Sequence, residues 1–441
     1  MIRWLVQLLL AGAALQVLAQ PLAEPRWRED LAQFRQQFLD RDRAFTVPAR
    51  LQAEQQLAAL EAGSGELDAI AFGLALARMA ALADNGHSAA FASARLNRCN
   101  RVEIRLVPFG EDFHVLRTRP ADADLLGARL LAIDGVALTR LREVAHALLG
   151  GVPAWRDRQA PSIWESPQLM HALGLSPVAD AAVYTFEGAD GRTVERRLVA
   201  DPPAPTRARG STDRLLLPEV LGPEFGWRAL LPTAQAPWVL RDAGQRLRWR
   251  HDAEIDAIVL EMRQASDAQG EPLGAYFDAV RAAVLVHKPR HLVLDLRFNG
   301  GGDLTRTRDF AEELPRLVPG RLFLLTSPWT FSAAISTAGY LKQAAPSRVT
   351  VVGEPIGDRL MFFAEGRAFT LKHSREVLRP ATERHDYLQG CRHHADCHAP
   401  VVSRPISVAT LMPDIPAPLS FADYRAGIDP AMLAVARALQ R

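Results

Sequence analysis

A continuous apolar strand followed by three glycines constrains the fold of this chain more than any other stretch. Residues 290–303 read RHLVLDLRFNGGGD, so Gly300, Gly301 and Gly302 come directly after the apolar run. Strands this uniformly apolar are typical of parallel sheets that are buried on both faces. Glycine has no Cβ, so such a loop can approach a ligand closely and present its N–H groups. An ordinary strand-to-helix turn is the alternative.

Strand patterns and helix patterns alternate from residue 252 onward. The strands are predicted at residues 254–263, 290–297, 321–327 and 348–354, with helical patterns between them. This order predicts a mixed α/β fold with a parallel-rich core over residues 252–441. In such folds ligands bind where loops leave the carboxyl ends of the strands, and the glycine loop lies at that edge.

A serine opens the helix that follows the third of these strands. Ser332 stands in the sequence TFSAA, and a serine in this place often caps the helix. Its Oγ and the N–H of Ala333 would also face the same crevice as the glycine loop. Ser332 can therefore act as a nucleophile, with the N–H groups of Gly301 and Ala333 as an oxyanion hole. A phosphate-binding loop is excluded because no Gly-Lys-Ser/Thr follows the glycines.

Three segments precede the core. Residues 20–98 place apolar side chains three and four positions apart, which predicts a helical region. Residues 99–203 alternate like strands and contain an Asp-Gly turn, which predicts a β-rich segment. Residues 204–251 begin with a stretch rich in Pro, Arg and Gly, and we expect a linker that leads to the core.

The first residues indicate export. Arg3 precedes an apolar run that ends in small residues, which predicts a signal peptide over residues 1–19, cleaved after Ala19. An uncleaved anchor is the alternative. We expect a periplasmic or secreted protein without a membrane span after cleavage. Lys plus Arg number 52 and Asp plus Glu number 50, so charge gives no reason to expect a nucleic-acid partner.

Two cysteines six positions apart, Cys391 and Cys397, are expected to form a disulfide in an oxidising compartment. The same stretch offers three possible metal ligands, His393, His394 and His398. Their spacing matches no usual zinc pattern, so we predict no metal site. Cys99 is then the odd cysteine, expected to be buried.

Several stretches together resemble one peptidase family. They are DLRFNGGG, TFSAA, ADNGHS, LLGARLLAIDGVAL, VVGEP and PDIPAPLSFADYRAGIDPAM. In this order they resemble the tail-specific, or carboxyl-terminal processing, serine peptidases and their tricorn-core and interphotoreceptor retinoid-binding-protein relatives, over most of the mature chain. The resemblance implies a crotonase-like ββα core, a degenerate PDZ-like part in residues 99–203, a peptide or protein substrate, and no cofactor.

The resemblance also identifies the expected base. Many family members use a lysine about 25 residues beyond the serine, but here Gly357 and Asp358 occupy that place. Lys342 and Lys372 lie at other positions. The tricorn-like branch carries a catalytic histidine, and His87 in DNGHSAAF stands at its place. His87 is therefore the expected base, and a turn residue is the alternative.

The acid that would orient His87 has several candidates. The resemblance favours Glu365, then Asp358; Glu354 is the third candidate, and a structural turn residue is its alternative. Asp84 could orient His87 locally or cap the turn. The remaining polar residues of the glycine loop, Asp295, Arg297 and Asn299, are expected to support it together with Gly300 and Gly302.

Two functions remain after the sequence is read. The first is an exported serine endopeptidase that forms an acyl-enzyme on Ser332, with His87 as general base. The second is a non-catalytic protein on the same scaffold that binds a peptide or a hydrophobic ligand.

Overall fold

The structure is a computed structural model. It describes residues 25–440 except for 64–66, 91–96, 204–211, 221–223, 268–269, 271 and 393. The predicted signal peptide, residues 1–19, lies outside the described residues. Within the described part of the chain, no helix is long and apolar enough to cross a membrane.

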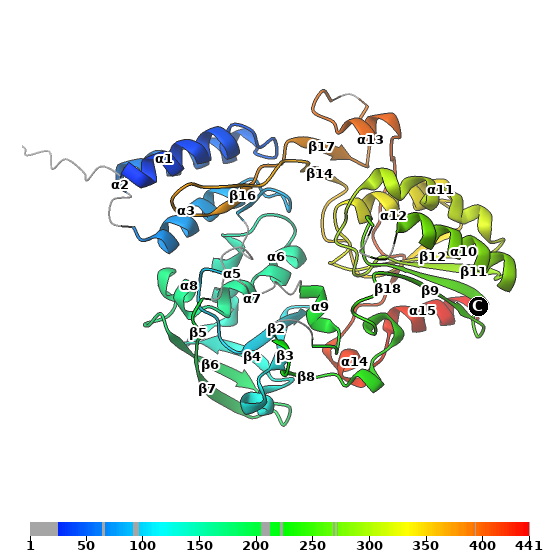
Figure 1. The fold of residues 1–441 in the computed structure, drawn as a ribbon, viewed down its shortest axis with the longest axis horizontal. Helices are drawn as coiled ribbons and strands as arrows, with labels where there is room; N and C mark the ends of the chain where they lie inside the picture. Colours follow the sequence, from blue (N-terminus) through cyan, green and yellow to red (C-terminus); the bar gives the residue numbers. More distant parts are fainter. Residues whose placement is uncertain are drawn as a thin grey trace, which may run out of the picture.

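A six-stranded sheet forms the core of the C-terminal half, in the order β18-β13-β12-β11-β10-β9 (Figure 1). Its strands are β9 (Leu247–Asp252), β10 (Ala257–Met262), β11 (His291–Asp295), β12 (Leu322–Thr326), β13 (Val349–Gly353) and β18 (Ile415–Pro416). Five of them are parallel, and only the edge strand β9 is antiparallel to its neighbour β10. The predicted mixed α/β fold with a parallel-rich core is confirmed.

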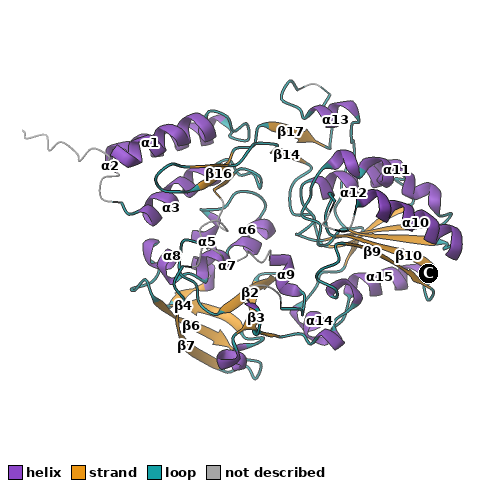
Figure 2. Cartoon of the chain, viewed as in Figure 1, coloured by secondary structure: helices purple, strands orange, loops and turns teal. Residues whose placement is uncertain are grey.

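Helices cover both faces of this sheet (Figure 2). Leu292 and Leu294 of β11 pack with α10 (Leu273–His287), α11 (Arg308–Leu317) and α12 (Ala333–Ala344). Val293, which points to the opposite face, packs with Val435 of α15 (Pro430–Leu439). Successive strand residues thus enter different clusters, which is why β11 reads as a continuous apolar run.

The N-terminal region is helical, as its periodicity predicts. It contains α1 (Pro25–Phe34), a π-helix (Arg35–Leu39), α2 (Val47–Gly63) and α3 (Ala69–Ala81), followed by the short strand β1 (Ala89–Ala90). The rings of Trp27 and Phe72 stack with their centroids 4.3 Å apart. This contact joins α1 to α3 in a hydrophobic core that the helices share with the β-rich segment, for example with Ile104 and Phe113.

A second sheet follows, with the order β2-β3-β4-β6-β7 and antiparallel pairing. Its strands are β2 (Ile104–Phe109), β3 (Asp112–Thr118), β4 (Arg129–Ile133), β6 (Ala181–Glu187) and β7 (Thr193–Val199), and β5 (Val136–Ala137) pairs with β4. The helices α5 (Leu138–His146), α6 (Pro153–Gln159), α7 (Pro161–Trp164) and α8 (Pro167–Ala172) lie between β5 and β6 in the chain. The segment predicted as a linker adds α9 (Thr212–Leu216) and a strand, β8 (Arg228–Ala229), which pairs with β3.

An arm leaves the core after β13 and reaches the N-terminal helices (Figure 1). It contains β14 (Met361–Ala364), β15 (Phe369–Thr370), β16 (Val377–Arg379) and β17 (Glu383–Asp386). Strand β1 pairs with β16, and β14 pairs with β17. The side chain of Asn85 donates to the Phe363 carbonyl at 2.9 Å and accepts from the Phe363 N–H at 3.1 Å. These contacts fasten the end of the N-terminal region to a segment more than 270 residues later.

Candidate active site

Ser332 lies in a strained turn at the start of α12. Its backbone has φ 57° and ψ −128°, in the positive-φ region that non-glycine residues rarely adopt. Although Ser332 occupies the N-cap position, its hydroxyl makes no capping hydrogen bond. Backbone strain at a residue that makes no capping bond indicates a role in function rather than a role in starting the helix.

The glycine loop approaches Ser332 so closely that a side chain would not fit. A Cβ on Gly301, whose φ is +108°, would lie 2.6 Å from the Ser332 Cβ and 3.1 Å from the Ala333 nitrogen. The Gly301 N–H donates to Asn299 Oδ1 at 2.9 Å. Among the described residues, the Ala333 N–H has no hydrogen-bond acceptor. The two predicted oxyanion donors therefore lie close together. The Ala333 N–H is available to a ligand, whereas the Gly301 N–H is bonded to Asn299.

Buried hydrogen bonds and an ion-pair network hold the glycine loop in place. The Asn299 carbonyl accepts from the Phe331 N–H at 3.0 Å, which fixes the loop against the residue before Ser332. The guanidinium of Arg297 binds the Asp295 carboxylate at 2.7 Å and forms two bonds to Asp429, at 2.8 and 2.9 Å. Asp429 in turn caps α15, so this helix is tied to the loop.

His87 lies on the loop between α3 and β1 and packs against Phe331, the residue before Ser332. Its imidazole is stacked between Phe331, at a centroid distance of 4.3 Å, and Phe362 of β14, at 5.1 Å. Only 7% of the residue is exposed, and neither ring nitrogen has a hydrogen-bond partner among the described residues. A buried imidazole with both nitrogens unsatisfied, packed against the residue before a strained serine, is a candidate for proton transfer.

The carboxylate next to His87 belongs to Asp358. Asp358 Oδ2 lies 3.5 Å from His87 Nδ1, and the residue is 4% exposed. Its other oxygen accepts from the Arg359 N–H at 2.9 Å. Asp358 follows β13, so the carboxyl edge of the core sheet supplies this group as well as the glycine loop and the serine helix.

The other acidic candidates have different partners. Glu365 Oε1 lies 3.2 Å from His385 Nε2, and contact with this imidazole holds the pKa of the Glu365 carboxyl below its usual range. Burial raises the pKa of Glu354. Asp84 forms exposed ion pairs with Arg156 and Arg359. The structure thus brings Asp358, the second candidate of the sequence analysis, closest to His87.

The three lysines of the chain have other contacts. Lys342 Nζ donates to the Val349 carbonyl at 2.7 Å, and Lys372 pairs with Glu29 on α1 at 2.6 Å. Lys288 ends α10 in the left-handed conformation. A Ser–Lys pair is thus not formed, and His87 remains the candidate base.

A cavity of about 260 Å³ opens beside the glycine loop. Gly300, Gly301, Phe298 and Trp329 form part of its wall, and Arg158, Arg246 and Arg263 line it as well. The wall of this cavity is therefore rich in arginine next to the glycine loop.

Gly86 is a position where a single methyl group should disturb the site. An added Cβ would lie 2.9 Å from the Phe331 ring and 3.1 Å from Asp358 Oδ2. We expect Gly86→Ala to lower kcat/KM by about 10- to 100-fold, since small displacements of catalytic groups have effects of this size. Gly274→Ala is the control, because nothing lies within 4 Å of the added methyl and alanine suits a helix. Equal kcat/KM in the two variants would contradict the geometry described here.

Comparison with solved structures shows that the chain has the fold of CPAF. The structure of mature CPAF complexed with lactacystin aligns over 94% of this chain and 98% of its own, with a TM-score of 0.56 at 13% identity. A CPAF mutant aligns over 94% and 95%, with a TM-score of 0.53 at 13% identity.

A photosystem II D1 C-terminal processing protease covers 92% of this chain and 97% of its own at 14% identity, with a lower TM-score of 0.39. No protein-family model and no curated protein matches the sequence.

Proposed function

We propose that the protein is an exported serine peptidase of the tail-specific type. The observation that carries the proposal is the strained Ser332, packed against a glycine loop, with the buried imidazole of His87, whose nitrogens make no hydrogen bond, stacked on the preceding residue, Phe331. The resemblance of the sequence to tail-specific peptidases and the fold shared with CPAF support the same assignment.

In the proposed mechanism, Ser332 Oγ attacks the carbonyl carbon of a peptide bond while His87 Nε2 accepts its proton. The Ala333 N–H stabilises the oxyanion that forms, and the Gly301 N–H would exchange its bond to Asn299 for a second one. His87 then gives the proton to the leaving amine, which leaves an acyl-enzyme on Ser332. Water, activated by the same imidazole, releases the second product.

Asp358 is proposed as the residue that orients His87. A carboxylate facing Nδ1 fixes the tautomer with its proton on Nδ1, leaves Nε2 as the base, and stabilises the imidazolium that forms. The Nδ1 to Oδ2 distance of 3.5 Å exceeds a normal hydrogen bond. Catalytic hydrogen bonds are often long in ligand-free enzymes and shorten when substrate binds.

A fluorophosphonate probe tests the nucleophile directly. Ser332 Oγ should displace fluoride and form a phosphonyl ester, which peptide mass spectrometry would assign to Ser332. Ser332→Ala should abolish both the labelling and the hydrolysis of a casein substrate. The exposed Ser403 of α13 (Ala399–Ser403) provides the control Ser403→Ala, which should label normally. An unlabelled wild-type protein, or hydrolysis retained in Ser332→Ala, would favour the non-catalytic binding protein.

A further inference from the structure

Three side chains from the arm and the segment after it converge on one point. Glu365 follows β14, His385 belongs to β17, and His398 precedes α13. Glu365 Oε1 lies 3.2 Å from His385 Nε2 and 4.0 Å from His398 Nε2, and one ligand atom from each residue lies within 4.8 Å of the other two. Of the residues that the structure describes, these three make up the one such group of three.

Each histidine has its Nδ1 held by another group, which turns Nε2 toward this point. His385 Nδ1 lies 2.9 Å from the Tyr387 hydroxyl, which is itself 2.6 Å from Ser336 Oγ on α12. His398 Nδ1 lies 2.6 Å from the carboxylate of Glu383. Histidines that bind metals almost always have their second nitrogen fixed by a carboxylate, a backbone carbonyl or water. Glu383 is such a carboxylate for His398, and the Tyr387 hydroxyl takes the place of water for His385.

The buried nitrogen of His385 has no hydrogen bond. His385 is 3% exposed, and its Nε2 is 3.2 Å from Glu365 without hydrogen-bond geometry. Buried polar atoms are nearly always satisfied, because each unpaired one costs about 1–3 kcal/mol. A cation between Nε2 and the Glu365 carboxylate would satisfy this atom.

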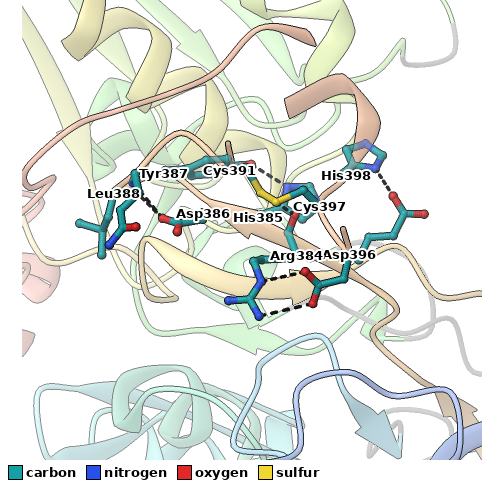
Figure 3. The surroundings of a disulfide bond; sticks show 11 residues. Arg384, His385, Asp386, Tyr387, Leu388, Cys391, Asp396, Cys397 and His398 are labelled. Atoms are coloured by element: carbon teal, nitrogen blue, oxygen red, sulfur yellow. Dashed lines mark hydrogen bonds and ion pairs between the residues drawn. A yellow bond between two sulfur atoms is a disulfide. The ribbon is translucent and has the colours of Figure 1, made fainter. Parts of the chain in front are cut away.

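Several contacts fix the chain around His398 in place (Figure 3). The Cys391–Cys397 disulfide closes the loop that ends directly before His398, and the Arg384 side chain pairs with Asp396 at 3.1 Å. The His398 N–H donates to the Arg384 carbonyl at 3.0 Å. The loop therefore holds His398 next to β17 before any ion arrives, which lowers the ordering cost of binding.

We propose that Glu365, His385 and His398 form a binding site for a divalent transition metal of the zinc class. Two imidazole nitrogens and one carboxylate oxygen suit Zn²⁺, whereas Mg²⁺ and Ca²⁺ prefer oxygen ligands alone. Tetrahedral ligands at about 2.0–2.1 Å are roughly 3.4 Å apart, so the group needs to contract by no more than about 1.5 Å. A water molecule completes the coordination.

This proposal differs from the sequence-based prediction of no metal site. Of the three histidines considered there, His393, His394 and His398, the proposed site uses only His398. His394 is exposed and is not part of the group, and His393 lies outside the described residues. Sequence spacing alone could not find the site, because Glu365, which follows β14, and His385 of β17 both precede the disulfide loop in the chain.

The position of the site gives the ion a structural effect. The rings of His398, His385, Phe362 and His87 stack in succession, with centroids 4.9, 4.9 and 5.1 Å apart. A bound ion would therefore fasten the arm that holds one side of the His87 ring.

The test uses the mature protein with any affinity tag removed, dialysed against a chelator and titrated with Zn²⁺ by calorimetry. We expect one ion per chain with a Kd below about 1 μM, a rise in Tm on loading, and visible bands of tetrahedral Co²⁺ when cobalt replaces zinc. His398→Ala and Glu365→Gln should weaken binding at least 100-fold. Glu383→Gln should weaken it by about 10- to 100-fold, the usual effect of losing a group that orients a ligand.

Two controls separate this site from incidental histidines. His373→Ala removes a histidine that pairs with Glu29 at 3.0 Å but has no third ligand, and His394→Ala removes an exposed histidine of the same loop. Both should bind zinc like the wild type. A wild-type protein that binds no zinc below 10 μM, or equal affinity in His398→Ala and His373→Ala, would overturn the proposal. Because the readouts are binding and Tm, the result does not depend on peptidase activity.

Discussion

Replacing His87 with alanine should lower kcat for a peptide substrate by about 10⁴- to 10⁶-fold, while the protein stays folded. The serine hydroxyl is a weak nucleophile without a base, and loss of the histidine in serine peptidases costs about as much as loss of the whole triad. The three lysines cannot take over, since two are bonded elsewhere and the third ends α10. Stopped-flow or fluorogenic assays measure kcat, and circular dichroism checks the fold. A loss below tenfold would contradict His87 as the base.

A second replacement determines which acid serves His87. Asp358→Asn keeps the size of the side chain but removes its charge, and we expect a fall in kcat of roughly 10⁴-fold, as in other triads. Glu365→Gln should have the smaller effect of the two, because Glu365 contacts His385 and His398 instead. A larger loss of kcat in Glu365→Gln than in Asp358→Asn would indicate that Glu365, not Asp358, orients His87.

Replacing Arg297 with alanine should lower the free energy of unfolding by about 3–5 kcal/mol, since breaking a buried ion pair leaves an uncompensated charge behind. Arg297 is 11% exposed and forms hydrogen bonds to both Asp295 and Asp429. Urea unfolding at neutral pH measures the loss. The control is Arg281→Ala, whose guanidinium is 41% exposed and pairs with Glu313. Such surface pairs are worth about 0–1 kcal/mol.

The effect of this replacement should depend on pH. Burial raises the pKa of Asp429, but the charge of Arg297 outweighs it and holds the pKa below its usual range. The ionised carboxylate therefore contributes stability above its unfolded pKa of about 3.9, and this contribution is lost as the pH falls through the folded value. The difference in stability between the wild type and Arg297→Ala should accordingly shrink in acid. A difference that grows in acid would contradict this role of Arg297.

Local patterns predicted most of the core and half of the site. The strands β10 to β13 are apolar on both faces, and the helices between them are periodic, so the sequence alone indicates a parallel-rich sheet. The same patterns place the glycine loop and Ser332 at one edge, because carboxyl ends of parallel strands meet there.

Long-range packing accounts for what the sequence did not predict. The β1–β16 pairing joins two very short strands, and Asn85 bonds to Phe363 through a side chain, so neither leaves a periodic signal. Glu365 was ranked before Asp358 because the family resemblance places an acidic residue at its position. The carboxylate observed next to His87 is that of Asp358, and its location depends on how the turn after β13 folds. Residues 204–251 were predicted as a linker because their first residues are typical of a loop. Strand β8 within them is only two residues long, too short to give a strand pattern.

The distance along the chain between His87 and Ser332 has a consequence for how activity arises. The two residues are 245 positions apart, and the packing of His87 against Phe331, the residue before Ser332, depends on the arm joining the N-terminal helices. Closure of such a long loop is costly and tends to come late in folding. Refolding chains should therefore regain helical circular dichroism before they regain reactivity with the probe. A newly made chain would then remain inert toward its neighbours until its two halves have met.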